Sequence, residues 1–295
     1  QLSGWILHIT ETEDTLFTIT GFADEIAHDL DEQIALLQKL NITHLEFRSA
    51  WGTKVLDLSR EELESAKSKL DAANISLSAV GSDLGKINIT DPFEDHLERA
   101  RHAIEVAKFF GTEYIRMFSF FIPEGDNPDD HRDEVLSRTR AMVALAEEGG
   151  ITLLHENEKG IYGDSPQRVR DLMLSIDSPR YRAIYDAANY VQTGFRPFEE
   201  SWPVVKDYVD YIHIKDATAP SAEHPIGVIT PAGQGAGQYP ELIAELHRNG
   251  FEGFLSIEPH LGDFDEFGGL CGPDLWTNAY DALTTILNDL DIQYN

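Results

Sequence analysis

The 295-residue sequence is poor in cysteine and in basic residues, and it contains no long apolar run. Cys271 is its single cysteine, which excludes an internal disulfide and a thiolate metal cluster. Only 23 lysines and arginines stand against 52 aspartates and glutamates, giving a formal charge of −29. Such a charge repels phosphate backbones and anionic lipid surfaces, so we expect neither a nucleic acid nor a membrane as partner. No stretch approaches the roughly 20 apolar residues of a transmembrane helix.

The N-terminal region is interpreted as an extension, residues 1–15, of a single domain that spans residues 1–295. Its apolar stretch Trp5–Leu7 is too short for the core of a signal peptide, and acidic residues follow it. Because the sequence does not start with methionine, we expect it to begin inside a longer chain. The composition, 42% hydrophobic, is sufficient for a sizeable core and is typical of a soluble protein. We therefore expect a cytoplasmic protein.

Short β-rich runs alternate with amphipathic stretches along the chain. The strands are predicted at Leu16–Thr20, Thr43–Phe47, Ile75–Val80, Glu113–Phe118, Ile151–His155, Tyr181–Tyr185, Tyr211–Ile214 and Phe254–Ile257. Helices are predicted at His28–Leu40, Ser59–Ala73, Phe93–Phe110, His131–Glu148, Ser165–Ile176, Tyr239–Asn249 and Asp274–Leu290. The sixth connection, around Glu199–Val205, is short and contains Pro203.

Eight strand–helix units without a linker predict parallel strands joined by right-handed crossovers. No Gly-x-Gly-x-x-Gly motif follows the first predicted strand and the sequence has no P-loop motif, which argues against a nucleotide-binding doubly wound sheet. The sequence therefore predicts an α/β fold, a single (β/α)8 TIM barrel. Chemistry in this fold takes place at the C-terminal ends of the strands.

The last four predicted strands each deliver a residue that can bind a metal at or near this end. These residues are Glu156, Asp186, His213 and Glu258. Any one of them alone is explained equally well as a helix cap or a solvated loop residue. Together, three carboxylates and one imidazole after apolar runs predict a site for one divalent metal, because unpaired carboxylates buried together would be costly. An oxygen-rich set favours Mn²⁺, with Mg²⁺, Co²⁺ and Zn²⁺ as alternatives.

Six segments resemble the xylose-isomerase-like TIM-barrel superfamily, which contains sugar phosphate isomerases and epimerases and also apurinic endonucleases. They are Gly21–Glu25, His155–Asp164, Tyr185–Asn189, His213–Asp216, Pro231–Gly235 and Ser256–His260. The likeness spans roughly residues 16 to 290. It implies that Glu156, Asp186, His213 and Glu258 hold one metal. It also implies that Glu156 and Glu258 form a catalytic acid/base pair on opposite faces of a ketose, acting through a metal-stabilised enediolate.

The sequence departs from the family pattern at three places. Asn189 stands where many epimerases and endonucleases have a histidine, and Ala219 stands where some epimerases have a substrate-binding arginine. The third and fourth strands end without the histidines that a three-zinc endonuclease site needs. An apurinic endonuclease is therefore not expected, and a tagatose- or psicose-type epimerase is disfavoured.

Six polar residues near the strand ends are predicted to contact substrate: Lys215, Asn189, Glu46, Arg48, Arg116 and His260. For Lys215 a salt bridge to Asp186 or Glu258 is the alternative. Glu46 and Arg48 form either a structural ion pair or contacts to sugar hydroxyls. His155 is expected to be a packed, hydrogen-bonded core residue. The glycine-rich run 233–237 resembles a phosphate-binding loop, although no lysine follows it.

The combined interpretation is a metal-dependent sugar isomerase or epimerase that abstracts a proton next to a carbonyl. Its substrate would be a sugar or a polyol-derived ketone. A lyase of the same fold, of the inosose dehydratase or 3-keto-glycoside-cleaving kind, begins with the same enediolate and stays open. So does a barrel that is not catalytic by itself or that needs a partner protein. The sequence leaves open the exact sugar, its phosphorylation and a homo-oligomeric state.

Overall fold

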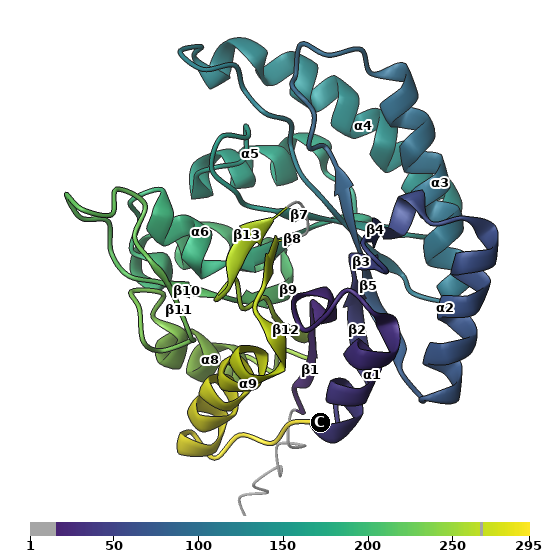
Figure 1. Cartoon of the computed structure of the whole chain (residues 1–295). Coiled ribbons are helices and arrows are strands. Elements are labelled where there is room, and N and C mark those ends of the chain that lie inside the picture. The colour runs from purple at the N-terminus through teal and green to yellow at the C-terminus, as the bar shows by residue number, and fades with distance from the viewer. Residues whose placement is uncertain (1–15, 266–267) are drawn as a thin grey trace, which may run out of the picture.

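The computed structural model describes residues 16–265 and 268–295, and in it eight parallel strands form a nearly closed barrel with helices on its outside (Figure 1). The strands pair in the order β1, β12, β9, β8, β7, β6, β5 and β2. Their bounds are β1 Thr18–Gly21, β2 His44–Phe47, β5 Ser76–Leu84, β6 Tyr114–Met117, β7 Thr152–Glu156, β8 Tyr181–Asp186, β9 Val209–Ile214 and β12 Phe254–Ile257. The predicted barrel is confirmed. The predicted extension 1–15 lies outside the described residues.

Within residues 16–265 and 268–295, seven long helices cover the outside of the barrel. They are α1 Leu30–Lys39, α2 Arg60–Ala72, α3 Glu94–Phe110, α4 Arg132–Gly149, α5 Pro166–Ile176, α8 Tyr239–Arg248 and α9 Gly272–Asp289. The sixth connection is divided into α6 Ala187–Gln192, a π-helical turn Pro197–Ser201 and α7 Trp202–Val205. Single 3-10 turns occur at Ala23–Glu25, Val55–Asp57, Pro128–His131 and Lys206–Tyr208.

Three small antiparallel hairpins extend from the loops that follow the barrel strands. They are β3 Ser49–Ala50 with β4 Thr53–Lys54, β10 Asp216–Ala217 with β11 Ile229–Thr230, and β13 Asp263–Asp265 with β14 Gly268–Leu270. Because these loops leave the C-terminal ends of the strands, the hairpins surround the end of the barrel at which the candidate ligands lie.

Local sequence signals explain where two helices begin and end. The backbone N–H of Glu62 donates to Ser59 Oγ and the N–H of Ser59 donates to Glu62 Oε2, which completes the predicted capping box of α2. Gly111 adopts the left-handed φ of 81° that closes α3.

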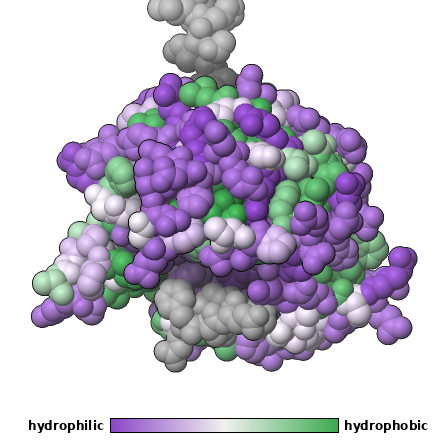
Figure 2. Space-filling model, turned by 90° about the horizontal axis from the view of Figure 1, so that it is seen from above, coloured by the Kyte–Doolittle hydropathy of each residue, from purple (hydrophilic) through white to green (hydrophobic). Residues whose placement is uncertain are grey.

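The apolar core lies mainly between the sheet and the helices, and a smaller cluster of Ala79, Leu154, Ile184 and Tyr211 fills the barrel interior. Among the described residues, no helix has the length and the apolar composition needed to cross a membrane. Viewed from above, hydrophilic side chains predominate on the surface, as the acidic composition leads one to expect (Figure 2).

Candidate metal centre

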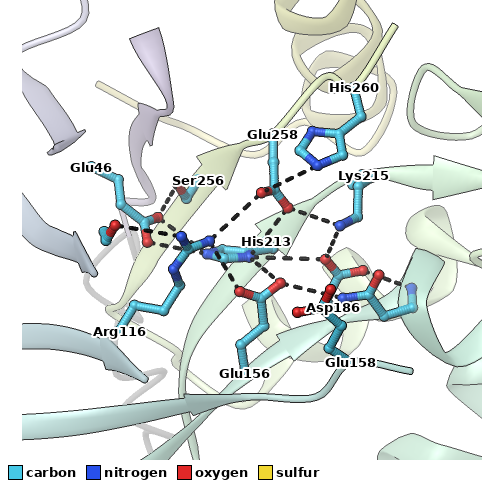
Figure 3. Close-up of polar contacts among 12 residues, drawn as sticks. Glu46, Arg116, Glu156, Glu158, Asp186, His213, Lys215, Ser256, Glu258 and His260 are labelled. Carbon is cyan, nitrogen blue, oxygen red and sulfur yellow. Dashed lines mark hydrogen bonds and ion pairs between the residues drawn. The ribbon is translucent and has the colours of Figure 1, made fainter. Parts of the chain in front are cut away.

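The four predicted metal ligands meet at the C-terminal end of the barrel (Figure 3). Glu156 and Asp186 are the last residues of β7 and β8, His213 is the penultimate residue of β9, and Glu258 follows β12 directly. One ligand atom from each side chain lies within 4.8 Å of those of the other three, and all four residues are buried. The parallel register of β7, β8, β9 and β12 thus brings together residues that are 102 positions apart at the extremes (258 − 156).

The imidazole of His213 lies at the centre of this cluster. Its Nδ1 is 3.3 Å from Glu156 Oε1, 3.7 Å from Glu258 Oε2 and 3.9 Å from Asp186 Oδ2. Yet Nδ1 is fully buried and makes no hydrogen bond to any described residue. A buried nitrogen without a hydrogen bond, surrounded by three carboxylate oxygens, is what a mononuclear divalent-metal site requires. The residues present therefore fit a metal ion.

The second nitrogen of the same ring, Nε2, contacts the carboxylate of Glu46. His213 Nε2 lies 3.1 Å from Oε2 of Glu46, and Ser256 Oγ donates to the same oxygen at 2.6 Å. All three side chains are completely buried. A carboxylate on the far nitrogen fixes the ring orientation of a metal-binding histidine and increases its basicity. Glu46 thus supports the candidate ligand His213.

Two cationic side chains, Lys215 and Arg116, neutralise the carboxylates of the cluster. Lys215 Nζ lies 2.9 Å from both Asp186 Oδ2 and Glu258 Oε2. Nη1 of Arg116 lies 3.2 Å from Glu156 Oε2 and 3.7 Å from Glu258 Oε1. These contacts repay part of the desolvation cost of burying three carboxylates. The salt bridge predicted as the alternative role of Lys215 is therefore present with both carboxylates.

Burial and these neighbours shift the acid dissociation of the ligands in different directions. Burial favours the neutral form of Glu156, but the charge of His213 outweighs it and lowers the pKa to about 2. For Asp186, burial is opposed mainly by Lys215 and the pKa is raised to about 6. Burial also opposes ionisation of Glu258, yet Lys215, His260 and His213 hold its pKa well below the usual range. At neutral pH both glutamates are consequently ionised and able to accept a proton.

Asn189 and Asp186 are connected through the start of α6. Asp186 Oδ1 accepts the backbone N–H of Asn189 at 2.8 Å and so caps the helix, which leaves Oδ2 directed to the cluster. The side-chain amide of Asn189 donates to Glu156 Oε1 at 3.3 Å and to the carbonyl of Asn157 at 2.8 Å. Asn189 thus contacts a candidate ligand directly.

The ion pair between Glu46 and Arg48, one of the two alternatives left open by the sequence, is not formed, because Glu46 contacts His213 instead. Arg48 instead makes a bidentate pair with Asp24 at 2.7 and 2.8 Å and approaches Glu258 Oε1 at 3.3 Å. It also donates to Glu25 at 3.0 Å. The physical reason lies in register: the partner of Glu46 comes from β9, on the other side of the barrel.

Asp24 and Glu25 were not assigned a role from the sequence, although they follow the first strand directly. Glu25 is fully buried and accepts both the backbone N–H and the Nδ1 hydrogen of His260 at 2.7 Å. Through this contact His260 places its Nε2 3.7 Å from Glu258 Oε1. The signal that could have identified them is the pair of acids at a strand end, the same signal that identified Glu156 and Asp186.

The glycine-rich run 233–237 does not present free amides to a phosphate. The backbone N–H groups of Gly233, Gly235 and Gly237 all donate to the carboxylate of Asp216, at 2.8 to 3.0 Å. The loop therefore does bind an anion through its backbone amides, but that anion is the carboxylate of Asp216. His155, by contrast, is buried as predicted, with Nε2 2.8 Å from Ser119 Oγ.

A cavity of about 330 Å³ opens above the cluster. Its wall consists of Arg48, Lys54, Val55, Leu56, Gly81, Ser82, Asp83, Lys86, Arg99, Arg116, Glu156, Glu158, Lys159, Lys215, Glu258 and His260. Four of the six predicted substrate-contacting residues are in this wall. As far as the described residues define it, Glu46 and Asn189 are not. The volume suits a small molecule of sugar size.

Comparison with known proteins agrees with this architecture. The sequence profile of the xylose isomerase-like TIM barrel family matches residues 34–275. A 3-dehydroshikimate dehydratase of Bacillus anthracis is 22% identical over 226 residues, covering 75% of this chain and 78% of that protein. A 2-epi-5-epi-valiolone 7-phosphate 2-epimerase of an Actinoplanes strain is 33% identical over 96 residues, 32% of this chain and 33% of that protein.

A solved structure extends the fold comparison. A xylose isomerase-like TIM barrel protein from Mycobacterium smegmatis, in complex with magnesium, superimposes with a TM-score of 0.69 at 19% identity. The superposition covers 92% of this chain and 98% of that one.

Proposed function

Because this chain belongs to the xylose isomerase-like TIM barrel family, we propose that it is a divalent-metal-dependent enzyme that abstracts a proton next to the carbonyl of a polyhydroxy compound. The isomerase or epimerase reaction is the principal proposal. The observation that carries it is the buried cluster at the strand ends, in which two ionised glutamates flank a histidine nitrogen that has no hydrogen bond. Relatives of the chain include an epimerase and a dehydratase, and both reactions fit this arrangement.

Glu156, Asp186, His213 and Glu258 would hold the metal. A divalent ion there would polarise the substrate carbonyl and stabilise negative charge on the enediolate oxygens. The three-carboxylate donor set favours a hard ion, and we propose Mn²⁺, with Mg²⁺, Co²⁺ and Zn²⁺ as alternatives.

Glu156 and Glu258 are proposed as the acid/base pair. They approach His213 from opposite sides (Figure 3), and the low pKa of each keeps it ionised at neutral pH, so that it can accept a proton. One carboxylate removes the proton from the carbon next to the carbonyl, and the other, once protonated, returns a proton from the far side. His213 and Lys215 contribute most to keeping Glu156 and Glu258 ionised, and Arg116, which contacts both, adds to this effect.

Two further residues are proposed as substrate contacts. Lys215 can direct a charge-assisted hydrogen bond to a developing enediolate oxygen, since its ammonium lies between Asp186 and Glu258 at the cavity wall. Arg48 reaches the same wall from β2. For Glu46 and Asn189 we propose a positioning role in place of the predicted substrate contact, because each touches a candidate ligand.

A lyase reaction is the second candidate, supported by the dehydratase relative that matches three quarters of the chain. β-Elimination starts with the same proton abstraction and then needs an acid near the leaving group. His260, in the cavity wall with Nε2 3.7 Å from Glu258, is placed for that task.

Product analysis separates the two reactions. The Mn²⁺-loaded protein is incubated with ketoses, inososes, 3-keto-glycosides and 3-dehydroshikimate, and products are identified by NMR. A new stereoisomer or aldose–ketose pair supports the isomerase proposal, and a new olefinic or aromatic signal with loss of water or of the aglycone supports the lyase. A fully metal-loaded protein without turnover on any compound would favour a barrel that is not catalytic by itself.

A further inference from the structure

The wall of the cavity reverses the charge balance of the chain. Seven of the 23 lysines and arginines line it, against four of the 52 aspartates and glutamates. Positive side chains gathered in one cavity repel one another, and a chain with a formal charge of −29 has few of them to place there. A local requirement for positive charge at this position would account for it.

Six of the seven cations contact carboxylates within the described structure, and five of them contact carboxylates of the metal centre or of Asp83. Arg48, Arg116 and Lys215 contact the carboxylates of the metal centre. The other two, Lys54 and Arg99, share the carboxylate of Asp83. These five are largely accounted for by the site itself.

Lys86 and Lys159 stand on the loops that follow β5 and β7, and they are not accounted for in this way. Lys86 lies 2.9 Å from Glu158 Oε2 and 4.2 Å above the ring of Phe118. Lys159 donates to the amide oxygen of Gln192 at 3.4 Å and has no carboxylate partner among the described residues. Burial lowers the pKa of Lys159; the charge of Glu158 opposes this shift, and the charges of Lys215 and Lys86 add to it. Among the described residues, Lys86 is thus paired with one carboxylate, Glu158, and Lys159 with none.

We propose that this cavity binds a substrate with an anionic group, a carboxylate or a phosphate monoester, and that Lys86 and Lys159 recognise the group. The inference rests on the proposed function, since it places the anion at these two loops while the reacting carbon lies at the metal centre. The two ammonium groups and the carboxylate of Glu158 leave a net positive charge at the cavity wall, where both lysines are exposed, and an anion would neutralise it through charge-assisted hydrogen bonds.

Binding of unreactive ligands tests this proposal without requiring turnover. The probes are D-glucitol, D-gluconate and D-glucitol 6-phosphate, which share a carbon chain and differ in one terminal group. Titration calorimetry on the protein treated with EDTA prevents any anion from being held by a metal. We expect one of the two anions to bind at least about tenfold more tightly than D-glucitol, and the better one identifies carboxylate or phosphate.

Three variants locate the contact. Lys159→Gln should weaken binding of the better anion about five- to tenfold, and Glu158→Gln, which frees Lys86, should strengthen it about threefold. Lys206→Gln is the matched control, because Lys206 precedes β9 at the opposite end of the barrel and should leave affinity unchanged.

Equal affinity for the three probes, no detectable binding of either anion, or an anion preference unchanged in both Lys159→Gln and Glu158→Gln would overturn the proposal. A failure of the proposed reaction is seen separately, as absence of proton exchange in a protein that still prefers the anion.

Discussion

Glu46 and His213 are 167 positions apart in the sequence, yet Glu46 Oε2 lies 3.1 Å from His213 Nε2 in the centre of the barrel. This contact turns the opposite nitrogen, Nδ1, toward the three carboxylates of the metal centre. Burial lowers the pKa of His213, but Glu46 and Glu156 outweigh burial and raise it well above its usual range. With its pKa raised in this way, the imidazole without a metal carries a proton on Nδ1 as well as on Nε2. A divalent ion would replace the proton on Nδ1, while the Nε2 hydrogen continues to be donated to Glu46.

Glu46→Gln should weaken Mn²⁺ binding about 10- to 100-fold, because the amide cannot supply the negative charge that increases the basicity of the imidazole. The dissociation constant is measured by electron paramagnetic resonance of free Mn²⁺. Glu158→Gln is the control: it removes a nearby carboxylate that is not in the four-residue cluster, and it should change the affinity by no more than about threefold. Equal losses in the two variants would show that only overall charge matters.

Much of this site was predictable because each candidate ligand follows an apolar run at a strand end. Sequence periodicity predicts the strands, and the strand order of a barrel then places Glu156, Asp186, His213 and Glu258 at one end. The partner of Glu46 was not predictable in the same way, since strand β9 lies across the barrel and contact across it depends on tilt and register. The occupied cradle around Asp216 has the same origin: a glycine-rich loop does not indicate which carboxylate it will enclose.

Metal binding should stabilise the fold through the same four residues. At a free Mn²⁺ concentration 100 times the dissociation constant, the free energy of unfolding should rise by about 2.7 kcal/mol, provided the unfolded chain does not bind the ion. The wild-type melting temperature, measured with Mn²⁺ and with EDTA, should therefore differ by several degrees. Asp186→Asn should abolish most of this difference. A variant that gained as much stability from Mn²⁺ as the wild type would remove Asp186 from the ligand set.

The free energy of unfolding should decrease as the pH is lowered, because of His155. Burial lowers the pKa of this imidazole to about 3. The imidazole therefore stays neutral in the folded chain at pH values at which it is protonated in the unfolded chain, that is, below pH about 6.5. The contribution is complete above the unfolded pKa and is lost progressively as the pH falls toward the folded one. At pH 5, which is about 1.5 pH units below the unfolded pKa, the loss in the free energy of unfolding is about 2 kcal/mol.

Urea denaturation at pH 7.5 and pH 5 measures this effect in the wild type and in His155→Gln. Glutamine keeps a hydrogen-bonding group near Ser119 but does not titrate. The wild type should lose about 2 kcal/mol more than the variant between the two pH values. The same loss in both proteins would assign the acid sensitivity to other groups.

Deuterium exchange from solvent directly tests whether the protein abstracts a proton next to a carbonyl. The Mn²⁺-loaded protein is incubated in D₂O with the ketose, inosose and 3-keto-glycoside panel, and the C–H signals are followed by NMR. If the proposed proton abstraction takes place, we expect exchange at a carbon next to the carbonyl in the wild type. In Glu156→Gln, exchange should fall by at least about 100-fold while the melting curve stays cooperative. Exchange at the wild-type rate in Glu156→Gln, or none in a wild-type protein with its metal bound, would contradict it.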